Sequence, residues 1–153
     1  MKISILTLFP EMFEGPFDYS IINQAQEKKK VNIEFVNIRD FGIGRHKVVD
    51  CKPYGGGHGM ILRVDVLEKA INSAKDKRLT TKDQVVILLS PHGKTFNQRK
   101  ALELSKLKHL ILICGRYEGI DERAKQFIDE EVSIGDFILT GGEIPAMLVV
   151  DSV

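Results

Sequence analysis

Residues 109–145 read HLILICGRYEGIDERAKQFIDEEVSIGDFILTGGEIP, and this stretch decides the fold class that the sequence predicts. Two short apolar runs, 110–114 and 132–134, each lead into a loop that contains glycine. Strands that end in such loops are typical of open α/β sheets, which bind ligands at the carboxyl ends of their strands. Glycine allows the main chain to approach a flat ligand closely. The stretch therefore predicts a ligand site built from main chain, with Glu118 as one acidic side chain beside it.

Composition describes an ordinary soluble domain. The 153 residues are enough for one domain with a substantial core, 43% of them are hydrophobic, and no apolar run is long enough to span a bilayer. Residues 1–13 are apolar but lack the cleavage pattern of a signal peptide, so we predict a strand there. Cys51 and Cys114 have no metal-type spacing, which indicates a reduced, cytoplasmic protein. The net charge of +1 provides no overall attraction to nucleic acid.

Segments with strand periodicity alternate along the chain with segments of helical periodicity. Strands are predicted at 2–9, 31–38, 84–89, 110–114 and 132–134. Helices are predicted at 20–29, 65–74, 97–106, 121–129 and 143–153. We expect Ser20 to cap the first helix and Ile21, Ile22 and Ala25 to form its apolar face. This alternation predicts an α/β fold with a mainly parallel sheet flanked by helices.

Two further segments bear on the domain organisation of the chain. Residues 40–59 show no periodicity and hold six of the thirteen glycines, as expected of a long functional or mobile loop. The predicted last helix ends at LVVDSV without glycine or a basic last turn. We therefore expect a chain cut within a longer protein.

Two glycine motifs resemble nucleotide-binding loops. Gly93-Lys94-Thr95 follows a strand and precedes a helix, but Leu88 occupies the position of the first glycine that a phosphate-binding loop requires, and Pro91 removes an N–H. The segment 53–59 follows an irregular loop rather than a strand, which argues against a dinucleotide-binding motif. We interpret both motifs as coincidental.

Single polar residues leave alternatives open. Glu118 is either a ligand contact or a solvated loop acid, and Asp121 is best explained as a surface acid that caps a helix. His46 and Asp50 are either functional or solvated. Arg45 belongs to a basic loop that meets phosphates or simply faces water.

Three groups of residues resemble the bacterial tRNA (guanine-N1)-methyltransferases of the knotted SPOUT class. They are LFPEMF at 8–13, RHKVVDCKPYGGGHGM at 45–60, and the segments 114–123 and 133–147. The resemblance covers essentially the whole chain in order. It implies a trefoil-knotted parallel sheet, with S-adenosylmethionine as methyl donor and tRNA as acceptor. Cys51 stands where the family usually has a second aspartate, and His58 where proline is common.

The resemblance also implies which residues contact each substrate. The donor-binding residues are expected on three loops: Leu88, Leu89, Ser90 and Pro91; Gly115, Tyr117 and Glu118; and Ser133, Ile134, Gly135, Asp136, Phe137, Ile138, Leu139, Gly141, Gly142 and Pro145. The candidates on the substrate side are Arg45, His46, Asp50, Tyr54, Gly55 and Gly59. No residue is assigned to a metal, and the sequence leaves open whether Mg²⁺ assists.

The implied reaction is methyl transfer to N1 of the guanine on the 3′ side of the anticodon. This nitrogen is protonated at neutral pH, so a base must remove the proton while a cation stabilises charge on the purine oxygen. The resemblance places an aspartate base, its partner arginine and a tRNA-binding domain after Val153, and it implies a homodimer. Residues 1–153 are then a donor-binding domain that lacks efficient catalysis. The alternatives are a P-loop-like nucleoside triphosphatase and a non-catalytic RNA-binding module.

Overall fold

The central strand of the sheet, β6 (His109–Cys114), is buried along its whole length, as its unbroken apolar run predicts. The computed structural model describes residues 1–53, 55, 56 and 58–153. β6 lies between β1 (Lys2–Thr7) and β5 (Gln84–Thr95) and is parallel to both. A strand with neighbours on both sides and helices over both faces has no contact with water, so every side chain of β6 belongs to the core.

The predicted strands and helices appear in the expected order along the chain, together with two short strands and 3₁₀ helices that periodicity did not predict. The other strands are β2 (Asn32–Asn37), β3 (Asp50–Cys51), β4 (Ile61–Leu62) and β7 (Glu130–Ser133). The α-helices are α1 (Ser20–Glu27), α2 (Val64–Ala74), α3 (Gln98–Leu104) and α4 (Glu143–Ser152). Three 3₁₀ helices, η1 (Pro10–Phe13), η2 (Ile38–Phe41) and η3 (Glu122–Phe127), complete the described part of the chain.

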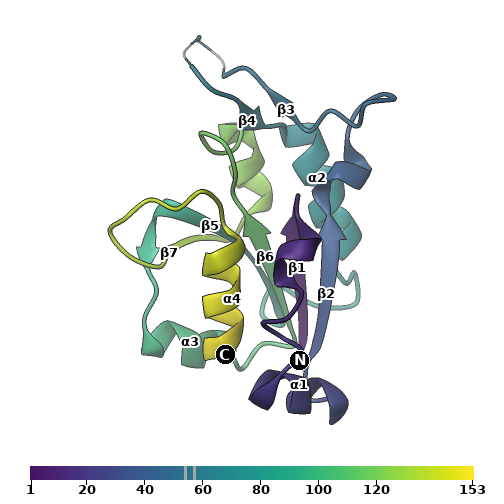
Figure 1. The fold of residues 1–153 in the computed structure, drawn as a ribbon, viewed down its shortest axis with the longest axis vertical. Helices are drawn as coiled ribbons and strands as arrows, with labels where there is room; N and C mark the ends of the chain where they lie inside the picture. The colour runs from purple at the N-terminus through teal and green to yellow at the C-terminus, as the bar shows by residue number, and fades with distance from the viewer. Residues whose placement is uncertain (54, 57) are drawn as a thin grey trace.

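The main sheet has the strand order β2-β1-β6-β5-β7, and all four pairs of neighbours are parallel. This confirms the predicted α/β fold with a mainly parallel sheet. The carboxyl ends of these strands therefore meet along one edge, and the antiparallel hairpin of β3 and β4 lies beyond that edge (Figure 1). The trefoil knot concerns the path of the chain and not the strand order, so it stays a prediction.

The two faces of the sheet carry separate apolar clusters. Alternate residues of β6 point to opposite sides, so Ile111 and Ile113 join one cluster while Leu110, Leu112 and Cys114 join the other. Helix α2 covers the first face, with α4 on the second (Figure 1). The inner strands are thus covered on both faces, although the edge strand β2 is partly exposed, with Phe35 at 41%.

The first helix differs from its prediction. α1 begins at Ser20, but Ser20 makes no capping hydrogen bond and the N-cap residue is Tyr19. Ile22 and Ala25 are half-buried as predicted, whereas Ile21 is 78% exposed. A helix this short covers only a narrow part of the sheet edge, so one of the three apolar side chains remains in water.

The long loop 40–59 is more ordered than its lack of periodicity suggests. It holds part of η2, a turn closed by hydrogen bonds between Ile43 and Val48, and strand β3. Its partner β4 also forms a parallel bridge from Leu62 to Ile120, after β6. Two-residue strands carry too little sequence to show an alternation, so periodicity did not reveal them.

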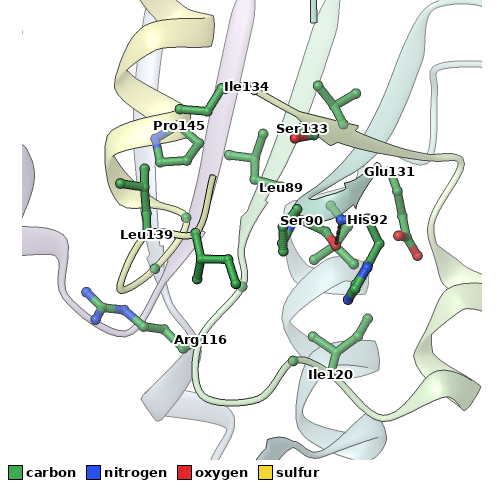
Figure 2. Close-up of a pocket in the computed structure, with 18 of the residues that line it drawn as sticks. Leu89, Ser90, His92, Arg116, Ile120, Glu131, Ser133, Ile134, Leu139 and Pro145 are labelled. Atoms are coloured by element: carbon green, nitrogen blue, oxygen red, sulfur yellow. Dashed lines mark hydrogen bonds between the residues drawn. The ribbon is translucent and has the colours of Figure 1, made fainter. Parts of the chain in front are cut away.

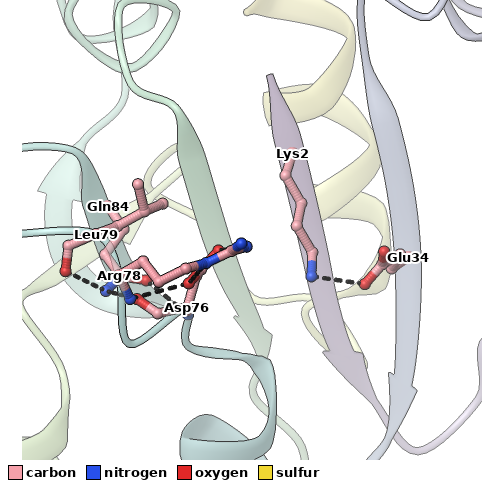
Figure 3. Close-up of polar contacts among 6 residues, drawn as sticks. All are labelled: Lys2, Glu34, Asp76, Arg78, Leu79 and Gln84. Atoms are coloured by element: carbon pink, nitrogen blue, oxygen red, sulfur yellow. Dashed lines mark hydrogen bonds and ion pairs between the residues drawn. The ribbon is translucent and has the colours of Figure 1, made fainter.

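The amino-terminal end of the sheet is closed by polar contacts. Gln84 donates from Nε2 to the carbonyl oxygens of Asp76 (3.0 Å) and Leu79 (3.3 Å), and Lys2 pairs with Glu34 at 2.8 Å (Figure 3). His109 lies fully buried beside this end, with Nε2 2.9 Å from Ser4 Oγ. Its Nδ1 has no hydrogen-bond partner among the described residues. Burial, reinforced by the charge of Lys2, lowers the pKa of His109.

This burial predicts a pH dependence of stability. His109 takes up a proton near pH 6.5 in the unfolded chain and only at a lower pH in the folded chain. Between these two pH values the unfolded state therefore binds more protons than the folded state. The free energy of unfolding should therefore fall as pH drops below about 6.5. His109→Gln cannot be protonated there and should show a shallower fall in urea titrations at pH 7, 6 and 5.

His92, whose side chain is exposed, provides the matched control. His92→Gln should keep the slope of the unmodified protein. Equal slopes for all three proteins would show that His109 does not titrate between the folded and unfolded states.

Candidate functional site

A cavity of about 220 Å³ opens at the carboxyl edge of the sheet, beside residues 88–92 of β5 and beyond the ends of β6 and β7 (Figure 2). Three loops surround it, and every donor-binding residue that the sequence predicts lines it except Gly135 and Asp136, which belong to the same third loop. The cavity is also lined by His92, Arg116, Gly119, Ile120, Glu122, Lys125, Glu131, Val132 and Thr140. The structure thus brings together three segments that are far apart in the sequence.

The first loop is an outward excursion of β5. Leu89 and Lys94 both pair with Val132 of β7, so the chain leaves the sheet after Leu89 and returns at Lys94. The strand therefore does not end at Leu89 as predicted but continues to Thr95. A Cβ on Gly93 would lie 2.6 Å from the carbonyl carbon of Val132, so only glycine allows this return. The motif Gly93-Lys94-Thr95 is thus extended backbone beside β7 and not a phosphate-binding loop.

The second loop, 115–119, is held by the hairpin. The Glu118 N–H donates to the Met60 carbonyl (3.1 Å), and the Leu62 N–H donates to the Gly119 carbonyl (3.0 Å). Tyr117 has a φ of +60°, a strained value for a residue with a side chain. These two hydrogen bonds fix the turn that carries Tyr117 and Glu118.

The predicted substrate-side residues divide into two groups. Asp50 lies close to Tyr117, and burial together with this carboxylate raises the pKa of the Tyr117 phenol. Gly59 packs against the side chain of Glu118, where a Cβ would lie 3.1 Å from the carboxylate carbon. Asp50 and Gly59 therefore adjoin the second loop.

The other substrate-side candidates either lie away from the cavity or are not among the residues that the structure describes. Arg45 and His46 are exposed in the turn between Ile43 and Val48 and do not line the cavity. Gly55 is exposed, and Tyr54 lies outside the described residues.

The third loop, 134–142, connects β7 to α4 and touches the second loop directly. The Gly142 N–H donates to the Gly115 carbonyl at 2.9 Å. At the start of the loop the Ser133 hydroxyl donates to the Gly135 carbonyl at 2.9 Å. Between these points Ile138 is 85% exposed. The loop is thus fixed at both ends and presents apolar side chains to solvent at the mouth of the cavity.

Asp121 differs from its prediction. It caps η3 as expected, but it is 3% exposed and pairs with Arg123 at 2.7 Å. Hydrogen bonding by Arg123 holds the pKa of Asp121 below its usual range. The surface interpretation was wrong because the chain folds the N-cap under the hairpin, where the Asp121 N–H donates to the Leu62 carbonyl.

Sequence reasoning missed Arg116 and Glu143. Glu143 is 1% exposed and pairs with Arg116, with 3.0 Å between Oε2 and Nη2. The Thr7 hydroxyl donates to Glu143 Oε1 at 2.8 Å. An acid at the first position of a helix is common because it complements the helix dipole, so its sequence position offered no sign of burial.

The described part of the chain offers no preformed metal site, and its buried cysteine is unsuited to act as a nucleophile. Within residues 1–53, 55, 56 and 58–153, no three His, Cys, Asp or Glu side chains gather in a way that could hold a metal ion. Cys114 is buried, and burial raises the pKa of its thiol, so it stays protonated. None of the helices that the structure describes is long and apolar enough to cross a membrane.

A parallel α/β sheet with glycine loops around one cavity at its strand ends defines a ligand-binding α/β domain. The chain belongs to the tRNA (Guanine-1)-methyltransferase TrmD family, which it matches over residues 1–153. It is 56% identical over its whole length to the tRNA (guanine-N(1)-)-methyltransferase of Dictyoglomus turgidum and 55% identical to that of Carboxydothermus hydrogenoformans. It covers 60% and 59% of those proteins, so it spans about three fifths of their length.

A solved structure supports the same assignment. The crystal structure of tRNA (m1G37) methyltransferase from Aquifex aeolicus matches all of this chain and 68% of its own, with a TM-score of 0.87 and 38% sequence identity. Neither alternative class proposed from the sequence, a nucleoside triphosphatase or a non-catalytic RNA-binding module, is favoured by these relatives.

The contact between the second and third loops predicts the effect of a single methyl group. A Cβ on Gly142 would lie 2.6 Å from Cys114 Cα and 2.8 Å from the Gly115 nitrogen, both of them main-chain atoms. Gly142→Ala should therefore destabilise the fold by roughly 1–3 kcal/mol, the usual cost of overpacking. Urea denaturation would measure this loss.

Ile138→Ala, on the exposed part of the same loop, should leave stability within about 0.5 kcal/mol of the unmodified protein. If Gly142→Ala left the free energy of unfolding unchanged, the second and third loops would have to separate easily.

Proposed function

We propose that this chain is the donor-binding domain of an enzyme that transfers a methyl group from S-adenosylmethionine to N1 of the guanine 3′ of the anticodon in tRNA. One observation carries the proposal: the cavity beside β5, β6 and β7 is formed by the three loops on which the family resemblance implies donor contacts. The cavity has an apolar floor, including Leu88 and Pro145, and main-chain groups from glycine loops around it. Such a site suits a flat purine with a polar tail.

The donor's charged end is proposed to meet Glu118. This side chain lines the cavity, is exposed, and packs on Gly59. A carboxylate there can pair with the donor's ammonium group and reduce the unfavourable charge of the sulfonium. As the family resemblance implies, we propose that the aspartate base that removes the N1 proton and the arginine that stabilises the purine oxygen lie outside residues 1–153. We therefore assign donor binding, and not turnover, to residues 1–153.

The acceptor is proposed to approach from the hairpin side. Asp50 and Gly59 adjoin the second loop. Arg45 and His46 lie exposed in the turn between Ile43 and Val48, in the same long loop 40–59. Basic and main-chain groups there can contact phosphates of a bound tRNA. We propose a cytoplasmic location, with both free cysteines kept reduced.

Calorimetry with S-adenosylmethionine tests the proposal. The folded chain should bind it saturably, and Glu118→Gln, which keeps the shape and removes the charge, should weaken binding about tenfold, the size of a charge-assisted hydrogen bond. An analogue that lacks the ammonium group should lose much less affinity.

Glu27→Gln, an exposed change on α1 outside the cavity, is the matched control and should not alter binding. Absence of binding by a folded sample would contradict the proposed function. Equal losses for both ligands would instead mean that Glu118 acts by holding its loop. Tight, salt-dependent binding of tRNA without donor binding would favour an RNA-binding module.

The assembly is proposed to be a homodimer through α4 and η1. From the sequence we expect the contact on the apolar face of the helix at 148–150 and on parts of the first helix, but Val149 and Val150 are buried within the chain. The exposed apolar side chains on this surface are Ile144 and Leu148 of α4, with Phe9 and Met12 at η1. α4 and η1 contact each other, so these side chains can form one surface.

Sedimentation should give twice the chain mass of 17.2 kDa at micromolar concentration. Leu148→Glu places a charge on the proposed surface, and because the side chain is 41% exposed the fold should tolerate it. This variant should sediment as a monomer. A monomeric unmodified protein would remove the assembly proposal.

A further inference from the structure

A buried ion pair, Arg116–Glu143, lies where the second and third loops meet. Arg116 Nη2 is 3.0 Å from Glu143 Oε2, and Arg116 Nε donates to Glu143 Oε1 at 3.3 Å. The Arg116 side chain is 17% exposed and Glu143 is 1% exposed. Oε2 has no hydrogen-bond partner among the described residues, so its charge is balanced by the ion pair. A carboxylate in this position depends on the nearby guanidinium.

The guanidinium also connects segments that are distant in the sequence. Its Nη1 donates to the Thr140 carbonyl at 3.1 Å, and its Nη2 lies 3.3 Å from Met12 Sδ. Its Cζ stands 4.6 Å from the centre of the Phe9 ring. One planar group therefore reaches α4, the third loop and η1 at once, which the fork of an arginine allows and a lysine does not.

Arg116 and Thr140 line the cavity, but the contacts of the guanidinium lie where the second and third loops meet. Figure 2 shows the Arg116 guanidinium directed away from the residues around the cavity. Yet Arg116 stands between two expected donor contacts, Gly115 and Tyr117, and Thr140 and Glu143 flank two more, Gly141 and Gly142. The hydrogen bond from Gly142 to Gly115 closes the same junction. The pair can thus affect a ligand only through the loops that it holds.

We propose that the Arg116–Glu143 pair is a positioning device that holds the third loop against the second before the donor arrives. This inference rests on the proposed donor binding. In this proposal the two side chains act through the loops and not on the reacting atoms, so both are positioning residues. The device lowers the entropy cost of binding, because the loop is already in the arrangement that the donor needs. Without it, the apolar part of the loop at the cavity mouth is free to move.

Two measurements on single variants test this device. Arg116→Lys keeps a cation beside Glu143 but cannot also reach the Thr140 carbonyl and the Phe9 ring. It should retain its unfolding midpoint in urea, exchange amide hydrogens faster in 134–142 without ligand, and bind S-adenosylmethionine about tenfold more weakly. Glu143→Gln should show the same exchange and binding changes.

A double variant guards against simple loss of folding. Arg116→Met with Glu143→Gln leaves no unpaired charge in the core, and such neutral replacements are often tolerated. The double variant should fold, while the amide hydrogens of its third loop exchange rapidly and its binding of S-adenosylmethionine stays weak. Arg123→Lys is the matched control, since Arg123 also pairs with a buried acid, Asp121, but does not line the cavity. It should change neither exchange in 134–142 nor binding.

The outcomes separate the two proposals. Folded variants with unaltered exchange and affinity would overturn the positioning device, and so would faster exchange with unaltered affinity. A double variant that binds like the unmodified protein would also overturn it. If the unmodified protein binds no donor, the proposed function fails, and the positioning inference falls with it. Exchange in 134–142 would then still show whether the pair holds the loop.

Discussion

A carboxylate buried in the interior must have its charge balanced, and this constraint shapes the site end of the molecule. Glu143 begins α4 with almost no exposure, and Arg116 meets it from the loop after β6. Removing one partner of a buried pair typically costs about 3–5 kcal/mol, a large share of a domain's stability. The start of α4 is therefore tied to the end of β6. That tie places the third loop over the edge of the sheet, where a cavity results.

The same edge also carries the hairpin, which gives the site two sides. Main-chain hydrogen bonds join Glu118, Gly119 and Asp121 to Met60 and Leu62, so the second loop belongs to both the cavity and the hairpin. A parallel sheet collects its strand ends on one edge, and segments from across the chain become neighbours there. The proposed division between a donor side and an acceptor side follows from this shared loop.

Local sequence patterns were sufficient for most elements. The apolar runs at β1, β5, β6 and β7 and the apolar stripe of α2 were predicted within a few residues, because buried strands and amphipathic helices have strong periodicity. The errors have a common physical origin in contacts between distant segments. β5 continues past Leu89 because β7 accepts it again at Lys94. Asp121 is buried because the hairpin covers it, and Ile21 is exposed because α1 covers little of the sheet.

The sequence by itself determined the class of sheet, the order of most strands and helices along the chain, and the glycine loops after 110–114 and 132–134, since each depends on neighbours along the chain. Family resemblance added which loops should meet at a ligand. Only the tertiary structure decided how those loops are held. The pairing of Arg116 with Glu143 and the contact of Gly142 with Gly115 each join residues about 27 positions apart, as their numbers show. Such pairs leave no periodic trace, because the distance between them is closed only when β6, β7 and α4 pack together.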